Sequence, residues 1–154
     1  PNILGVLNLT PDSFSDGGKF NKEKKGVKHA IHLLNVGANL IDVGGESTRP
    51  GSKTVKESLE WSRINKILKL LVKKNIPLSL DTRKSNIMKK GIDLGVQLIN
   101  DVSGLNFDIN SIDVLKKYKV PFVIQHSQGI PEDMQQNPTY KNELLDIYDF
   151  FEKK

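Results

Sequence analysis

The sequence of 154 residues contains no cysteine and no long apolar run. Without cysteine there is no disulfide and no catalytic thiol, and a zinc site loses its commonest ligand. No stretch approaches the ~18 apolar residues that a membrane span needs. A secretory signal consists of a basic stretch followed by an apolar core, and the sequence does not open with this pattern. We therefore expect a cytoplasmic protein without a membrane partner.

Aromatic residues are also scarce, at 6%, although the formal net charge is +5. A nucleic-acid-binding face typically combines arginine with interleaved aromatic residues. Here nearly all basic residues are scattered lysines, and only three are arginines: Arg49, Arg63 and Arg83. We expect no nucleic-acid partner, whereas the excess of positive charge favours small anionic ligands.

Three common catalytic motifs are missing as well. There is no G-x-S-x-G, no G-x-x-x-x-G-K-[ST] and no H-E-x-x-H, so serine hydrolases, P-loop NTPases and zincins have no support. No G-x-G-x-x-G follows the first apolar segment, which disfavours a dinucleotide-binding fold.

Short apolar segments alternate with longer segments of helical periodicity. The former are apolar on both faces, as buried parallel strands are, and comprise residues 3–8, 40–43, 78–81, 98–101 and 121–126. The latter carry apolar residues at helical spacing and comprise residues 27–34, 64–72, 87–92, 112–115 and 144–151. Such alternation predicts a parallel α/β fold.

Two parallel architectures fit this alternation, a doubly wound open sheet and a (β/α)8 TIM barrel. Polar residues follow the carboxyl end of each predicted strand, where barrel enzymes build their active sites. Five strand–helix units are too few to close an eight-stranded barrel. The prediction is an incomplete barrel of about five βα units, with an open sheet as the alternative.

The segments after the first two strands carry candidate binding residues. Residues 8–18 form a polar, glycine-ended segment with one aromatic residue, Phe14, which is typical of a mobile lid. In residues 42–51, two glycines are expected to allow a sharp bend. Thr48 and Arg49 then offer donors suited to phosphate or carboxylate. A surface ion pair of Arg49 is the alternative.

Asp81 and the pair Asn100–Asp101 end the next two strands. A carboxylate and a carboxamide at neighbouring strand ends can bind the edge of a flat heterocycle. Alternatively, Asp81 caps the following helix and Asp101 closes the following loop. His126 ends the fifth strand and is either structural or catalytic. His29 and His32, one helical turn apart, are expected to be surface residues rather than metal ligands.

Several of these motifs, in this order and spacing, resemble the dihydropteroate synthase family. The resemblance covers the whole chain and rests on residues 5–18, 44–51, 81–82, 99–101 and 126–135, with Pro138 and Tyr140. It implies an eight-stranded β/α barrel. In that case residues 1–154 are the N-terminal part of a pterin-binding TIM-barrel domain that lacks its last three units.

The resemblance also implies an activity. Family members are transferases that condense 6-hydroxymethyl-7,8-dihydropterin pyrophosphate with p-aminobenzoate in folate biosynthesis, giving 7,8-dihydropteroate and pyrophosphate. They require Mg²⁺, are inhibited by sulfonamides and form homodimers. On this basis the isolated chain is expected to be inactive.

Residue roles follow from the same resemblance. Asn8 would contact Mg²⁺ and pyrophosphate, and Thr48 and Arg49 would hold pyrophosphate. Asn8 and Arg49 would thereby share in catalysis with Asp81.

The other two ligands would be bound by four residues. Asp81 and Asn100 would bind the pterin edge, and Phe14 and Pro50 would help enclose p-aminobenzoate. Two alternatives remain: a pterin-binding methyltransferase domain, and a non-catalytic barrel segment that serves as an interaction module.

Overall fold

The computed structural model describes residues 2–10, 19–47, 51–129 and 138–154. Within these ranges strands and helices alternate strictly along the chain. Their order is β1 (Leu4–Asn8), α1 (Lys19–Asn35), β2 (Leu40–Gly44), α2 (Glu57–Lys73), β3 (Leu78–Asp81), α3 (Ser85–Leu94), β4 (Leu98–Asp101), α4 (Ser111–Tyr118), β5 (Phe122–Ile124) and α5 (Glu143–Glu152). The predicted alternation is confirmed.

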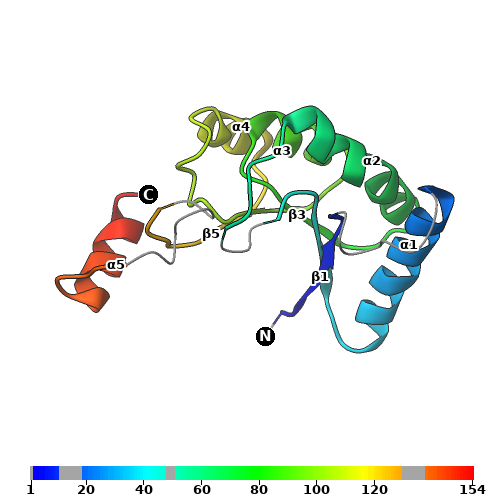
Figure 1. Cartoon of the computed structure of the whole chain (residues 1–154), viewed down its shortest axis with the longest axis horizontal. Helices are drawn as coiled ribbons and strands as arrows, with labels where there is room; N and C mark the ends of the chain where they lie inside the picture. The colour runs from blue at the N-terminus through cyan, green and yellow to red at the C-terminus, as the bar shows by residue number, and fades with distance from the viewer. Residues whose placement is uncertain (1, 11–18, 48–50, 130–137) are drawn as a thin grey trace.

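The strands form one parallel sheet in which spatial order equals sequence order, β1-β2-β3-β4-β5. Helices α1 to α4 lie on the same face of this sheet (Figure 1). A doubly wound sheet reverses its strand order and carries helices on both faces. The described part of the chain does neither, so it has the arrangement of consecutive units of a β/α barrel.

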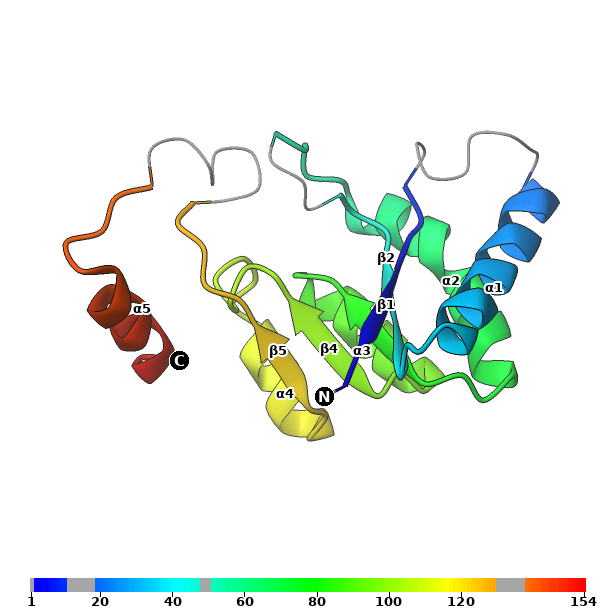
Figure 2. The ribbon, with the colours of Figure 1, turned by 90° about the horizontal axis from the view of Figure 1, so that it is seen from below.

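Strand β5 is shorter than predicted and lies at an edge of the sheet, as Figure 2 shows. Its register partner β4 ends at Asp101, which pairs with Ile124. Because the ladder has no partner beyond that point, Gln125 and His126 leave the sheet although the sequence favours a longer strand.

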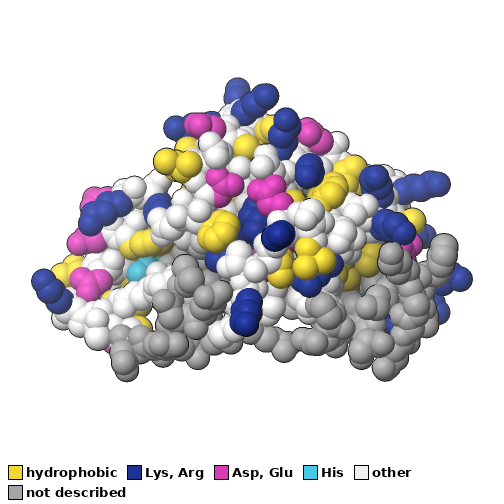
Figure 3. All heavy atoms as spheres, turned by 45° about the horizontal axis from the view of Figure 1, so that its top comes forward, with side chains coloured by type: hydrophobic (Ala, Val, Ile, Leu, Met, Phe, Trp, Pro, Cys, Tyr) yellow, Lys and Arg dark blue, Asp and Glu magenta, His cyan; other side chains and the backbone are white. Residues whose placement is uncertain are grey.

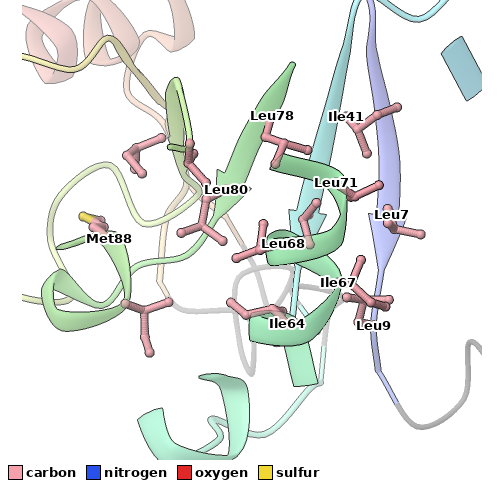
Figure 4. Packing of buried hydrophobic residues seen from close by; sticks show 14 of the residues in the cluster. Leu7, Leu9, Ile41, Ile64, Ile67, Leu68, Leu71, Leu78, Leu80 and Met88 are labelled. Carbon is pink, nitrogen blue, oxygen red and sulfur yellow. The ribbon is translucent and has the colours of Figure 1, made fainter. Parts of the chain in front are cut away.

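The hydrophobic core lies between the sheet and the helices. Leu7, Val43, Leu80 and Ile99 form one register row across β1 to β4, and all four are buried. Figure 4 shows α2 packed against this layer, with four side chains facing the strands, Ile64, Ile67, Leu68 and Leu71. Burying each such side chain contributes roughly 1.5–3 kcal/mol.

The helix-covered surface carries its charges in mixed order. On the face shown in Figure 3, lysine and arginine side chains are dispersed among acidic and apolar ones. Such a mixture is typical of solvated helix faces. In the part of the chain that the structure describes, no helix has the length and apolarity to cross a membrane.

Candidate functional site

A second register row, one residue after the buried one along each strand, carries the polar residues. Asn8 pairs with Gly44, Gly44 with Asp81, and Asp81 with Asn100. Successive side chains of a strand point to opposite faces. The buried row one residue earlier faces the helices, so this row faces away from them. The parallel register thus brings three predicted site residues together at the carboxyl edge of the sheet.

Gly44 provides the space between two of these side chains. A Cβ atom at this position would lie 3.2 Å from Asn8 Oδ1 and 3.3 Å from Asp81 Oδ2. Both oxygens therefore lie over the glycine, and any larger residue would push them apart.

The next residue, Gly45, packs against α2. A Cβ atom there would lie 2.8 Å from Ile64 Cγ2 and 3.0 Å from the carbonyl oxygen of Glu60. Neither Gly44 nor Gly45 has a positive φ. The expected bend is present at Gly45 and Glu46, directly after β2. It needs no positive φ, so both positions require glycine for space rather than for backbone conformation.

The Asn100 carboxamide is held in a defined orientation. Its Nδ2 donates a hydrogen bond of 3.0 Å to Oδ2 of the buried Asp42. Its Oδ1 lies 3.5 Å from Gln125 Nε2. Oδ1 of Asp42 is buried without a hydrogen-bond partner among the described residues. Asp42 therefore fixes the orientation of the Asn100 amide. Oδ1 of Asp42 remains as an acceptor for a hydrogen bond from a ligand.

Asp81 is half-buried at the end of β3, and its environment disfavours the charged form. Burial, followed by repulsion from Asp42 and then from Glu60, Asp101 and Glu46, raises the pKa of Asp81 to about 8. The carboxyl group therefore exchanges its proton close to neutral pH. A carboxyl group of this kind can donate or accept a hydrogen bond at a heterocycle and can respond to charge that develops there.

The structure decides between the alternative roles of Asp81 and of Asp101. Asp81 does not cap α3, whose N-cap residue is Lys84. Asp101, in contrast, closes its own loop, because its Oδ1 accepts hydrogen bonds from Ser103 N at 2.8 Å and Ser103 Oγ at 2.6 Å. Of the predicted pair, only Asn100 lies in the polar row.

His126 lies beside the sheet among aromatic side chains. Its Nε2 is 3.1 Å from the hydroxyl oxygen of Tyr140, and its ring meets Phe150 edge-on at 4.7 Å between centroids. These contacts favour the structural alternative. His29 and His32 are exposed on α1. Among the residues that the structure describes, no three His, Cys, Asp or Glu side chains form a metal-binding group.

A cluster of buried charges beside the polar row was not anticipated. Glu46, Glu60, Arg83 and Lys84 are each less than 5% exposed and form ion pairs with one another. One signal was present in the sequence. Glu60 lies four residues before Ile64, on the apolar stripe of its helix, where a carboxylate needs a buried partner.

Some predicted site residues lie outside the described residues. They are Phe14 with the rest of the expected lid at 11–18, and Thr48, Arg49 and Pro50. Their roles remain predictions from the sequence.

Comparison with known proteins agrees with this geometry. The family model described as pterin binding enzyme matches residues 4–154. The dihydropteroate synthase of Clostridium beijerinckii is 44% identical over 146 residues, 94% of this chain and 52% of the relative. That of Escherichia coli is 36% identical over 152 residues, 98% of this chain and 54% of the relative. The chain thus spans about half the length of these curated relatives.

Solved structures of dihydropteroate synthases resemble this chain at similar sequence identity and coverage. Dihydropteroate synthase from Clostridium difficile, crystallised in the presence of pteroic acid, superposes with a TM-score of 0.90 at 40% identity, covering 99% of this chain and 56% of that chain. The enzyme from Xanthomonas albilineans, solved with 4-aminobenzoic acid, gives a TM-score of 0.88 at 36% identity over 99% of this chain and 54% of that one. The chain therefore belongs to the family of pterin-binding enzymes.

Proposed function

We propose that residues 1–154 are the N-terminal part of a dihydropteroate synthase barrel and contribute the pterin edge and pyrophosphate contacts of its active site. The observation that carries this proposal is the juxtaposition of Asp81 and Asn100 in one register row, with Asp42 orienting the amide. A similarity to dihydropteroate synthases of 36–44% identity supports it.

In this proposal Asp81 and Asn100 bind the heterocycle. The pterin ring has adjacent N–H donors and ring acceptors, which match a carboxyl group beside a carboxamide. When the bond from the methylene carbon to pyrophosphate breaks, the leaving group takes the electron pair and the ring takes up positive charge. The ionised form of Asp81, which is accessible near neutral pH because its pKa is about 8, stabilises that charge.

The amine of p-aminobenzoate then forms the new C–N bond and releases a proton. No protein nucleophile takes part, which is consistent with a sequence that lacks cysteine. Thr48 and Arg49 are proposed to hold the pyrophosphate, and Phe14 and Pro50 to enclose p-aminobenzoate.

Asn8 is the proposed Mg²⁺ ligand. Its carboxamide oxygen is a hard donor in the polar row and lies over Gly44, which suits a cation that prefers oxygen. Mg²⁺ is usually bound by one or two protein ligands together with substrate phosphates and water, so a single protein ligand here fits. When bound, the cation would neutralise charge on the departing pyrophosphate.

The assay for this function measures pyrophosphate release and dihydropteroate formation with dihydropterin pyrophosphate and Mg²⁺, with and without p-aminobenzoate. Both the 154-residue chain and the native polypeptide that carries it are assayed. Release coupled to dihydropteroate by either would establish the function. Silence of both, together with methyl transfer from a methyl-folate, would instead favour the methyltransferase alternative.

The exchange of Arg49 for alanine tests the pyrophosphate contact. Charge-assisted, bidentate hydrogen bonds to phosphate are each worth roughly 1.5–3 kcal/mol, so we expect about 10- to 100-fold weaker binding of dihydropterin pyrophosphate. Binding of the free pterin should change less than twofold. Calorimetry with both ligands measures the difference, and an equal loss for both would contradict this role of Arg49.

A further inference from the structure

The buried charges beside the polar row form one connected cluster. Lys84 Nζ lies 2.8 Å from Glu46 Oε2 and 2.5 Å from Glu60 Oε2. Arg83 Nε lies 3.1 Å from Glu46 Oε2. Thr82 Oγ1 donates to Glu60 Oε1 at 2.6 Å. Two carboxylates and two cations thus neutralise one another. Burial by itself raises the pKa of Glu46, but the hydrogen bonds from Arg83 and Lys84 outweigh it and hold this pKa below its ordinary value.

This cluster joins both ends of the segment 47–53. Glu46 precedes the segment, and its Oε1 accepts a hydrogen bond of 2.8 Å from the backbone N–H of Val55, which follows it. Arg83 Nη2 donates to Thr54 Oγ1 at 2.9 Å. Both ends of the segment are therefore attached to the same two charged groups.

Two further contacts fix the base of this segment. Ser52 Oγ donates to the carbonyl oxygen of Ser47 at 2.6 Å, directly across it. Arg63 Nη1 on α2 donates to the carbonyl oxygen of Gly45 at 2.7 Å. The segment consequently starts and ends at defined positions against β3 and α2.

Stability alone does not account for such a cluster. Buried charges lose several kcal/mol each in solvation, and apolar residues of similar volume are commonly as stable or more so. What apolar residues cannot provide is a set of directional contacts that hold three chain segments in one arrangement. The Arg83 guanidinium, which also lies 4.0 Å from the centre of the Phe107 ring, has the planar form that this requires.

We propose that Lys84 and Arg83 are positioning residues that act through Glu46, placing the segment with Thr48 and Arg49 relative to Asp81 so that pyrophosphate and pterin are held in register. The inference rests on the proposed function. Asp81 lies directly before Thr82, Arg83 and Lys84, so one cluster sets the position of both ligand-binding elements.

The test replaces Lys84 by methionine in the native polypeptide. Methionine keeps the length of the side chain but leaves Glu46 and Glu60 without their shared cation. We expect at least tenfold weaker binding of dihydropterin pyrophosphate with Mg²⁺, and less than a twofold change for the free pterin. Lys89→Met is the matched control, at an exposed position on α3, the helix whose N-cap residue is Lys84, and should bind both ligands as the unaltered protein does.

Arg83→Lys is the second variant, in case Lys84→Met does not fold. It keeps the charge but loses the two-point contact with Glu46 and Thr54, so we expect a roughly threefold loss that is again confined to the pyrophosphate ligand. Equal losses for both ligands, or no loss in a folded variant, would overturn the inference. An unaltered protein that binds neither ligand would overturn the proposed function itself. Sensitivity to Arg49→Ala without sensitivity at Lys84 would overturn the inference alone.

Discussion

Replacing Asp81 by asparagine is expected to lower kcat/KM for dihydropteroate formation by about 100-fold, the effect typical of removing one preorganised charge-stabilising group. Asparagine preserves the size of the side chain and one hydrogen-bond acceptor, but it cannot ionise as the ring becomes positive. The loss should therefore appear mainly in kcat, because the interaction is strongest in the transition state. Steady-state kinetics with both substrates in the native polypeptide measure it.

Asp113→Asn is the matched control for this exchange. Asp113 is exposed on α4, outside the polar row, and its loss should leave both kinetic constants unchanged. If Asp81→Asn lowered kcat less than fivefold, charge stabilisation by this residue would be refuted. A rise in KM at constant kcat would instead show that Asp81 only binds the ground state.

The second large effect concerns stability. Thermal stability is expected to fall as the pH rises from about 4 to 8 and to level off by pH 9, because folding raises the pKa of Asp81 to about 8 from an ordinary value near 3.9. Between these values the folded state holds a proton that the unfolded state has released, so the stabilisation present at low pH declines across this interval and is fully lost above pH 8. Asparagine at this position removes that dependence.

The measurement compares melting temperatures of the unaltered protein and Asp81→Asn across this pH range. Towards pH 4 the two should agree closely, since the carboxyl group is then largely neutral in both the folded and the unfolded state. At pH 9 we expect the variant to melt at least 5 °C higher, because a pKa raised by about four units corresponds to several kcal/mol at roughly 1.4 kcal/mol per unit. Burial also raises the pKa of Asp101, so only the difference between the two curves reports on Asp81. Parallel curves would contradict the assignment.

Much of the candidate site was predictable from local patterns. Asp81 and Asn100 each follow a short apolar segment, and the carboxyl ends of parallel strands meet at one edge of a sheet. The alternation of side chains along a strand is equally local. These two regularities are sufficient to place both residues at one edge before any coordinates are known.

The role of the two glycines was not predictable in the same way. Two glycines after a strand suggest a bend. Gly44 and Gly45 must be glycine for a different reason, because atoms of Asn8, Asp81 and α2 approach them too closely to leave room for a side chain. A close approach of this kind depends on tertiary packing. Local sequence therefore predicted the bend after β2 but not the close contacts that require glycine there.

The buried charge cluster is the feature of the site that is least predictable from the sequence. Glu46 and Lys84 are 38 residues apart, and only the packing of β2, β3 and α2 brings their charged groups to 2.8 Å. Likewise, the orientation of Asn100 depends on Asp42, which is 58 residues away. Pairings at such separations leave no periodic trace along the chain.

The sequence by itself determined the strand–helix alternation, the apolar faces and the polar strand ends, because hydrophobic periodicity and backbone preferences act over a few residues. The tertiary structure alone decided the strand order, the register that aligns Asn8, Gly44, Asp81 and Asn100, and the hydrogen bonds of Asp101 to its own loop. It also decided the raised pKa of Asp81. Each of these depends on how far apart groups from distant segments come to lie once the sheet has formed, and the strength of their electrostatic interaction depends on that distance and on burial.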